Sequence, residues 1–144
     1  MNLKRITFSQ IELAVALGIA GALVVLAASV MLGASEDAKE TALARNLRTI
    51  RCQIEVFRGQ HGGLLPGRGG NCIEGQLVRK TDLKGRLDAD GPCGPYFCEF
   101  PANPFTDTNT VQSGTGGPGG GDHGWYYNTQ TGKLSPDDDK HKNM

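Results

Sequence analysis

The chain lacks an excess of charge of either sign, and it has no dense block of Lys and Arg. Fifteen basic residues balance fifteen acidic ones among 144 residues, so the formal net charge is zero. Proteins that bind nucleic acid usually present a clustered basic surface. We therefore expect no nucleic-acid partner.

The motifs that carry common catalytic and metal chemistry are also missing. No local signature ties His61, His123 or His141 to a Ser, Asp or Cys partner. The chain has neither C-x-x-C-H nor H-E-x-x-H, and its cysteines lack the C-x2-C spacing of structural zinc sites. A catalytic site needs a nucleophile, a base and a group that orients the base. We therefore expect a protein that is not an enzyme.

Proline is absent between residues 13 and 61, whereas most of the 21 glycines and all 7 prolines lie after residue 58. An uninterrupted helix is therefore expected first, followed by a segment rich in turns. The length allows one modest domain with an appendage. We predict an α+β fold in which a long N-terminal helix, with a membrane half and an amphipathic half, packs on a small antiparallel β-sheet head at residues 62–136.

Residues 13–34 form a run without any charged side chain. Roughly 20 apolar residues in a helix span the hydrocarbon core of a bilayer. Lys4 and Arg5 precede the run and Glu36 and Asp37 follow it, so the positive-inside rule places the N-terminus in the cytoplasm. Small residues recur at every fourth position and favour close helix packing. A cleaved secretory signal is the alternative, but the run is longer than the usual apolar region of such signals.

Glu12 lies at the edge of this run, where a carboxylate is costly unless it is paired or neutralised. The surrounding sequence, KRITFSQIEL from Lys4 to Leu13, resembles the prepilin motif of type IV pilins and type II secretion pseudopilins. That resemblance implies a leader at residues 1–7 and a membrane and assembly helix at residues 8–35. It implies that a prepilin peptidase cuts between Thr7 and Phe8 and methylates Phe8. Glu12 would then meet the N-terminal amine of a neighbouring subunit.

Thr7 differs from the motif, because the family normally has Gly immediately before the cleaved bond. Threonine is bulkier than glycine and is branched at Cβ. Cleaved and uncleaved chains are therefore both open alternatives.

Residues 36–61 continue the helical pattern as an amphipathic segment. Its apolar positions follow a 4-3-4-3 spacing that forms one narrow stripe; they are Leu43, Leu47, Ile50, Ile54 and Phe57. Gly59, Gly62 and Gly63 favour the end of the helix. The stretch from Asn46 to Pro66 is similar to the helix end of the major pseudopilin of type II secretion.

The sequence of the head predicts short strands that are separated by turns. We predict one strand at residues 94–100 and another at residues 124–128, which is followed by a hairpin loop at residues 128–132. Trp125 and Tyr127 share a face of the second strand and are expected to cover the helical stripe. Residues 113–124 are expected to form a mobile glycine-rich loop, and residues 137–144 a disordered tail.

The four cysteines, Cys52, Cys72, Cys93 and Cys98, all follow the apolar run. An even count in a small head favours disulfides and an oxidising compartment. Of the three possible pairings we favour Cys93–Cys98 with Cys52–Cys72, because each closes a short loop; free thiols are the alternative. The resemblance also implies a calcium ion in the late loop, for which Asp107, Asn109 and Asp122 offer hard oxygen ligands.

The resemblance implies a filament subunit anchored in the inner membrane with its head in the periplasm. Its expected partners are copies of itself, other pseudopilins, the inner-membrane assembly platform, the prepilin peptidase and membrane lipid. The expected function is to support protein export in a type II secretion-like pseudopilus. The alternatives are a type IV pilin for adhesion, motility or DNA uptake, and a monomeric membrane-anchored domain that binds a ligand through Trp125 and Tyr127.

Overall fold

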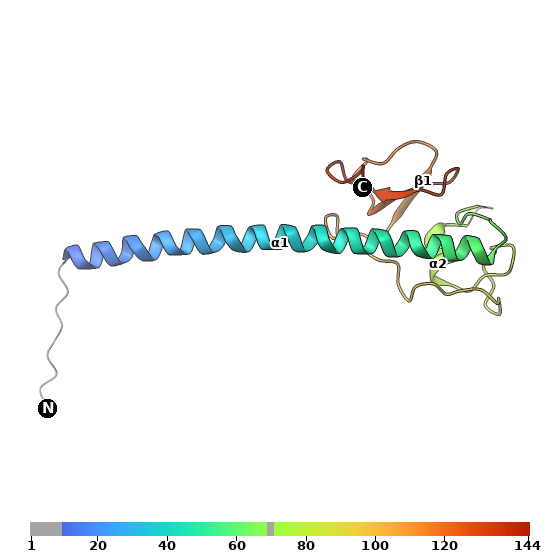
Figure 1. Ribbon diagram of the computed structural model, residues 1–144, viewed down its shortest axis with the longest axis horizontal. Coiled ribbons are helices and arrows are strands. Elements are labelled where there is room, and N and C mark those ends of the chain that lie inside the picture. Colours follow the sequence, from blue (N-terminus) through green and yellow to red (C-terminus); the bar gives the residue numbers. More distant parts are fainter. Residues whose placement is uncertain (1–9, 69–70) are drawn as a thin grey trace, which may run out of the picture. The chain divides into compact units, whose positions relative to one another are not determined.

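The computed structural model of the chain describes residues 10–68 and 71–144, with side chains from residue 35 onward (Figure 1). The elements in order are α1 (Gln10–Gln60), α2 (Ile73–Val78), β1 (Val111–Gly114), β2 (Trp125–Asn128) and β3 (Leu134–Pro136). The chain divides into two compact units, Met1–Ala38 and Lys39–Met144. All the elements after α1 lie in the second unit, which is called the head below.

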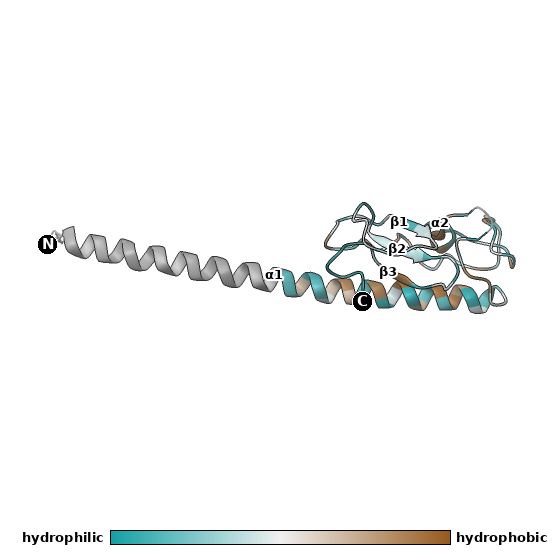
Figure 2. Cartoon of the chain, turned by 90° about the horizontal axis from the view of Figure 1, so that it is seen from above, coloured by the Kyte–Doolittle hydropathy of each residue, from teal (hydrophilic) through white to brown (hydrophobic). Residues whose placement is uncertain are grey.

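The core of the head is built on one stripe of α1. The five stripe side chains are at most 3 % exposed, and they are Leu43, Leu47, Ile50, Ile54 and Phe57. They pack with Ile73 and Leu77 of α2 and with Trp125, Tyr127 and Leu134 of the sheet. Figure 2 shows brown apolar residues alternating with teal polar ones along this part of α1. The predicted stripe is confirmed, and each such side chain contributes roughly 1.5–3 kcal/mol of hydrophobic stabilisation.

A turn that holds a buried histidine ends α1. The His61 amide donates to the Phe57 carbonyl, and Gly62 and Gly63 then adopt positive φ angles of 62° and 91°. The His61 ring stacks on Phe57 at 3.8 Å between centroids. Its Nδ1 lies 2.7 Å from the Phe57 carbonyl oxygen and its Nε2 lies 3.0 Å from Thr81 Oγ1. Both ring nitrogens are therefore hydrogen-bonded, and the ring joins the helix end to the loop at Thr81.

The sheet is mixed, so the expected antiparallel head is wrong. β1 pairs in parallel with β2, with Val111 opposite Trp125, and β3 pairs antiparallel with β2, with Leu134 opposite Tyr127. A tight hairpin cannot join parallel strands, because the chain must first return to the same end of the sheet. The glycine-rich segment between β1 and β2 makes this return, and its first residues, Ser113 and Gly114, belong to β1.

The expected membrane half of the helix is not found in the part of the chain whose side chains are described. Within that part, no helix is long and apolar enough to cross a membrane. The side chains of α1 are described from residue 35 onward. They form the amphipathic segment, in which charged and polar residues surround a single apolar stripe. The expected fold is therefore corrected on the sheet, whereas residues 8–34 of the expected membrane half lie outside the residues whose side chains are described.

Residues 94–100 do not form the predicted strand. Their backbone contains a cis peptide bond between Gly94 and Pro95, and the amides of Tyr96 and Phe97 both donate to the Leu77 carbonyl of α2. α2 itself was not expected, since a helix of 6 residues is too short to show a periodic pattern. The segment that resembles an alternating strand instead covers this short helix.

Candidate functional site

The processing and assembly residues predicted from the sequence are not visible in the structure. Thr7 and Phe8 lie outside the described residues, and Glu12 lies in the part of α1 whose side chains are not described. Their roles stay predictions. The described part of the chain instead shows what the head offers for contacts, cavities and metal ligands.

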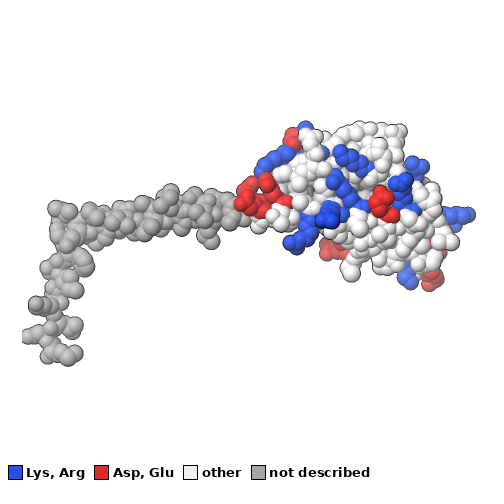
Figure 3. All heavy atoms as spheres, viewed as in Figure 1, with Lys and Arg blue, Asp and Glu red and all other residues white. Residues whose placement is uncertain are grey.

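The face of α1 opposite the core stripe is exposed along the head. Arg45, Arg48, Cys52, Glu55 and Val56 are all solvent-exposed on it. Figure 3 shows Lys and Arg side chains dispersed over one face of the head with acidic residues among them. This helix face is therefore a mixed polar surface.

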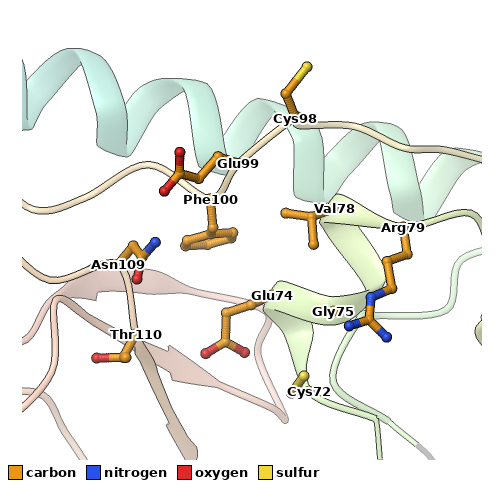
Figure 4. A pocket seen from close by; sticks show the side chains of 10 residues that line it. All are labelled: Cys72, Glu74, Gly75, Val78, Arg79, Cys98, Glu99, Phe100, Asn109 and Thr110. Carbon is orange, nitrogen blue, oxygen red and sulfur yellow. The ribbon is translucent and has the colours of Figure 1, made fainter.

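All four cysteines are free thiols in the structure. Cys52 is exposed on the outer face of α1, and Cys93 is buried in an isolated bridge with Thr81. Cys72 and Cys98 are exposed and line one cavity, but Figure 4 shows them on opposite sides of it, not pointing toward each other. The structure thus contains neither of the two favoured disulfides.

The cavity between Cys72 and Cys98 has a volume of about 410 Å³. Phe100 and Val78 give it an apolar wall, and Glu74, Glu99 and Arg79 give it charge of both signs (Figure 4). One carboxylate oxygen of Glu74 accepts the Val111 amide at 2.8 Å, which joins α2 to β1. Glu74 therefore has a structural role, and no nucleophile–base pair is formed in this cavity.

The three residues proposed for calcium lie in the loops before and after β1; they are Asp107, Asn109 and Asp122. Asn109 lines the cavity of Figure 4, while Asp107 holds a left-handed turn with φ 53° and Asp122 is exposed in the glycine-rich segment. Among the described residues, no group of three or more His, Cys, Asp and Glu side chains is placed to hold a metal ion. The proposed set contains two carboxylates and one amide, so this finding does not test it, and the calcium site stays a prediction.

Asp137 is a buried carboxylate that sequence reasoning placed in a disordered tail. It is 0 % exposed, and its Oδ1 accepts the amides of Gly119 and Gly120 at 2.9 and 3.3 Å. Its carbonyl accepts the Gly121 amide at 2.8 Å. His123 Nδ1 lies 3.9 Å from Asp137 Oδ2. The expected mobility of the glycine-rich segment is therefore opposed by one residue, which holds two successive amides with its side chain and a third with its backbone carbonyl.

The rest of the C-terminal segment is packed on α1 as well, which corrects the expected disordered tail. The Arg51 guanidinium donates to the Leu134 carbonyl at 2.7 Å and to the Met144 carbonyl at 2.9 Å. His141 is 7 % exposed, and its Nδ1 lies 2.6 Å from Asp138 Oδ1. Partial burial among these contacts lowers the pKa of Arg51 from its ordinary value. No sequence signal separates these residues from a solvated charged tail, since Arg51 and Phe105, which contact them, are distant in the sequence.

Asn103 connects two loops beside the sheet. Its side-chain amide donates to the Gly124 carbonyl at 2.9 Å, and its Oδ1 accepts the Phe105 amide at 2.9 Å. Trp125 Nε1 donates to the Pro101 carbonyl at 2.8 Å. The Pro101–Phe105 turn therefore supports the entry into β2.

No family model, no curated protein and no solved structure matches this chain. Its function is therefore inferred from its own residues.

Trp125 and Tyr127 were the residues proposed to hold a ligand in the monomeric binding-domain hypothesis. Both are 0 % exposed and pack in the core against α1. Burial raises the pKa of Tyr127 to about 12. They form the covering face that the sequence predicted for this strand, and they offer no open binding surface.

Proposed function

We propose that the chain is a structural subunit of a type II secretion-like pseudopilus that assembles through its N-terminal helix and supports protein export. The observation that carries the proposal is the order of features along the chain. Phe8 and Glu12 precede an uncharged run. The same helix then continues to Gln60 and supplies the stripe on which the head is built.

The chemistry of assembly follows from the position of Glu12. Cleavage before Phe8 would leave an α-amino group with a pKa near 8, which is largely cationic at neutral pH. An ion pair between this amine and Glu12 of a neighbouring subunit would remove a carboxylate charge that is otherwise unpaired near hydrocarbon. The register between neighbouring subunits would then be the one that forms this pair.

The proposal includes a location. Residues 13–34 would anchor the chain in the inner membrane as a single span before assembly, with the N-terminus in the cytoplasm and the head in the periplasm. The support is the uncharged run with basic residues before it and acidic residues after it. The exposed polar face of α1 in the head is compatible with contacts to subunits that remain partly hydrated.

A paired substitution tests the assembly role of Glu12. Glu12→Ala should leave the chain in the membrane and reduce the yield of sheared filaments to a small fraction of the wild-type yield. Glu36→Ala is the matched control, since it removes an acidic residue at the other end of the apolar run and should leave the yield near wild type. Normal filament yield with Glu12→Ala would remove the basis of the proposal.

A type IV pilin for adhesion, motility or DNA uptake remains the second candidate, because the same prepilin motif supports both systems. A deletion strain distinguishes the two. Loss of an exported protein from the medium with normal motility supports the secretion function. Loss of surface filaments and motility with normal export supports the pilin function.

A further inference from the structure

Tyr126 lies on the face of the sheet that points away from α1. Side chains alternate along a strand, so Tyr126 points opposite to Trp125 and Tyr127, whose side chains belong to the helix-side core. Tyr126 is only 4 % exposed, and its hydroxyl oxygen is buried without a hydrogen-bond partner. Burying an O–H donor without a hydrogen-bond partner costs free energy. A ligand that supplies an acceptor to this hydroxyl would remove that cost.

A cavity of about 300 Å³ lies beside Tyr126. It forms where the glycine-rich segment, the loop between β2 and β3, and the C-terminal segment meet, and its polar lining comes from Tyr126, Asn128, Lys133, Ser135, Lys142 and Asn143. A Cβ atom added to Gly114 or Gly116 would lie 3.4 or 3.8 Å from the Tyr126 hydroxyl. The side-chain-free backbone of these glycines therefore leaves space near the buried donor.

The lining of this cavity is rich in donors and contains no carboxylate. Lys133 and Lys142 supply two ammonium groups, and no Asp or Glu lines the cavity. Lys142 pairs with Asp139 at 2.8 Å, whereas no ion pair forms to Lys133 within the described head. The side-chain Oδ1 of Asn128 accepts the amides of Gln130 and Thr131, which leaves the side-chain NH₂ group as a donor. The cavity of Figure 4 differs, because Glu74 and Glu99 line it.

We propose that this cavity, the Tyr126 pocket, binds the phosphate group of a small polar phosphate ester. Donors from β2, the hairpin loop and the C-terminal segment surround it from several directions. A phosphate has three terminal oxygens for such donors and a carboxylate has two, and charged donors form the stronger hydrogen bonds. One water molecule occupies about 30 Å³ in the liquid, and this cavity has about ten times that volume. The cavity is therefore larger than a bare phosphate needs, and it has room for the group that is esterified to the phosphate. This inference goes beyond the proposed function and does not depend on it.

Calorimetric titration of the full chain in a non-ionic, phosphate-free detergent tests the pocket, with glycerol 3-phosphate and inorganic phosphate as the probes. Lys133→Gln should weaken binding about tenfold, because it removes a charged donor. Tyr126→Phe should weaken it severalfold, because it removes only the unpaired hydroxyl. Tyr127→Phe is the matched control, since it removes an equally buried, unpartnered hydroxyl from the other face of the sheet. That control should bind like the wild type.

The two sources of a phosphate ester are distinguished by a second titration with vesicles of phosphatidic acid, with phosphatidylcholine vesicles as the reference. Binding to glycerol 3-phosphate that depends on Lys133 and Tyr126 supports a soluble ligand. Binding to phosphatidic acid alone with the same dependence supports a lipid headgroup. The proposal is overturned if the folded wild-type chain binds none of the probes. It is also overturned if Tyr127→Phe weakens binding as much as Tyr126→Phe does. Fluorescence of the buried Trp125 reports that each variant is folded.

Discussion

Replacing Asp137 by Ala should destabilise the head by about 2 kcal/mol, although the sequence alone places this residue in a solvated tail. The Asp137 Oδ1 accepts two backbone amides, at 2.9 Å from Gly119 and at 3.3 Å from Gly120. A hydrogen bond to a charged group contributes about 1.5–3 kcal/mol. The Gly120 bond is the longer one and Gly120 is exposed, so water can replace it. The loss is therefore close to that of one charge-assisted bond.

Asp137→Asn is the informative partner of this variant. The asparagine oxygen can still accept the Gly119 amide, and the substitution removes a buried charge whose Oδ2 has no hydrogen-bond partner. Its cost should be less than half that of the alanine variant. Together the two variants separate the loss of the acceptor from the loss of the charge.

Urea unfolding followed by the fluorescence of Trp125 measures both variants. Trp125 is the single tryptophan of the chain and is 0 % exposed, so it reports on the head core. In a separate thermal unfolding experiment, a loss of 2 kcal/mol should lower the unfolding midpoint by about 8 °C for a domain of this size. An alanine variant within 0.5 kcal/mol of the wild type would refute the role of Asp137 in holding the glycine-rich segment.

Three further predictions concern the head. Burial raises the pKa of Tyr127 to about 12, so the unfolded chain loses this proton first as the pH rises above 10. The free energy of unfolding should therefore fall between pH 10 and 12, by up to about 1.4 kcal/mol per pH unit for this group, and Tyr127→Phe should make the fall shallower in urea titrations. Gly124→Ala should cost about 3 kcal/mol, because its Cβ would overlap the backbone carbonyl of Thr108; Gly117→Ala, where a Cβ meets nothing within 4 Å, should be neutral or stabilise by up to about 1 kcal/mol. Maleimide labelling of the reduced, folded chain should modify Cys52, Cys72 and Cys98 quickly and the buried Cys93 slowly, whereas fast labelling at Cys93 would contradict its place in the head.

The helix and the central strand could be predicted because their signals are local. The 4-3-4-3 spacing of Leu43 to Phe57 requires one buried helical face, and the structure buries all five side chains. The alternation of Trp125 and Tyr127 likewise placed both on the face that covers this helix. In both elements the period of the apolar residues decides which side chains are buried.

The strand pairing and the C-terminal segment could not be predicted in the same way. The parallel pairing of β1 with β2 depends on the path of the glycine-rich segment, and glycine permits many paths. Asp137 and His141 look like solvated residues in the sequence, because their burial depends on contacts with Gly119, Phe105 and Asp138. For the four cysteines, the only sequence signal was their even number, which does not decide whether any pair forms a disulfide.

The central claim is that the chain enters the prepilin pathway and assembles through its N-terminus. Intact-mass measurement and N-terminal peptide analysis of the native protein extracted from membranes test it most directly. The account predicts a mature chain that begins with N-methylated Phe8. A chain that begins at Met1 would mean that Thr7 prevents processing, so that no free amine exists to meet Glu12. A chain that begins near Ser35 would identify a secreted head and would contradict assembly through the helix.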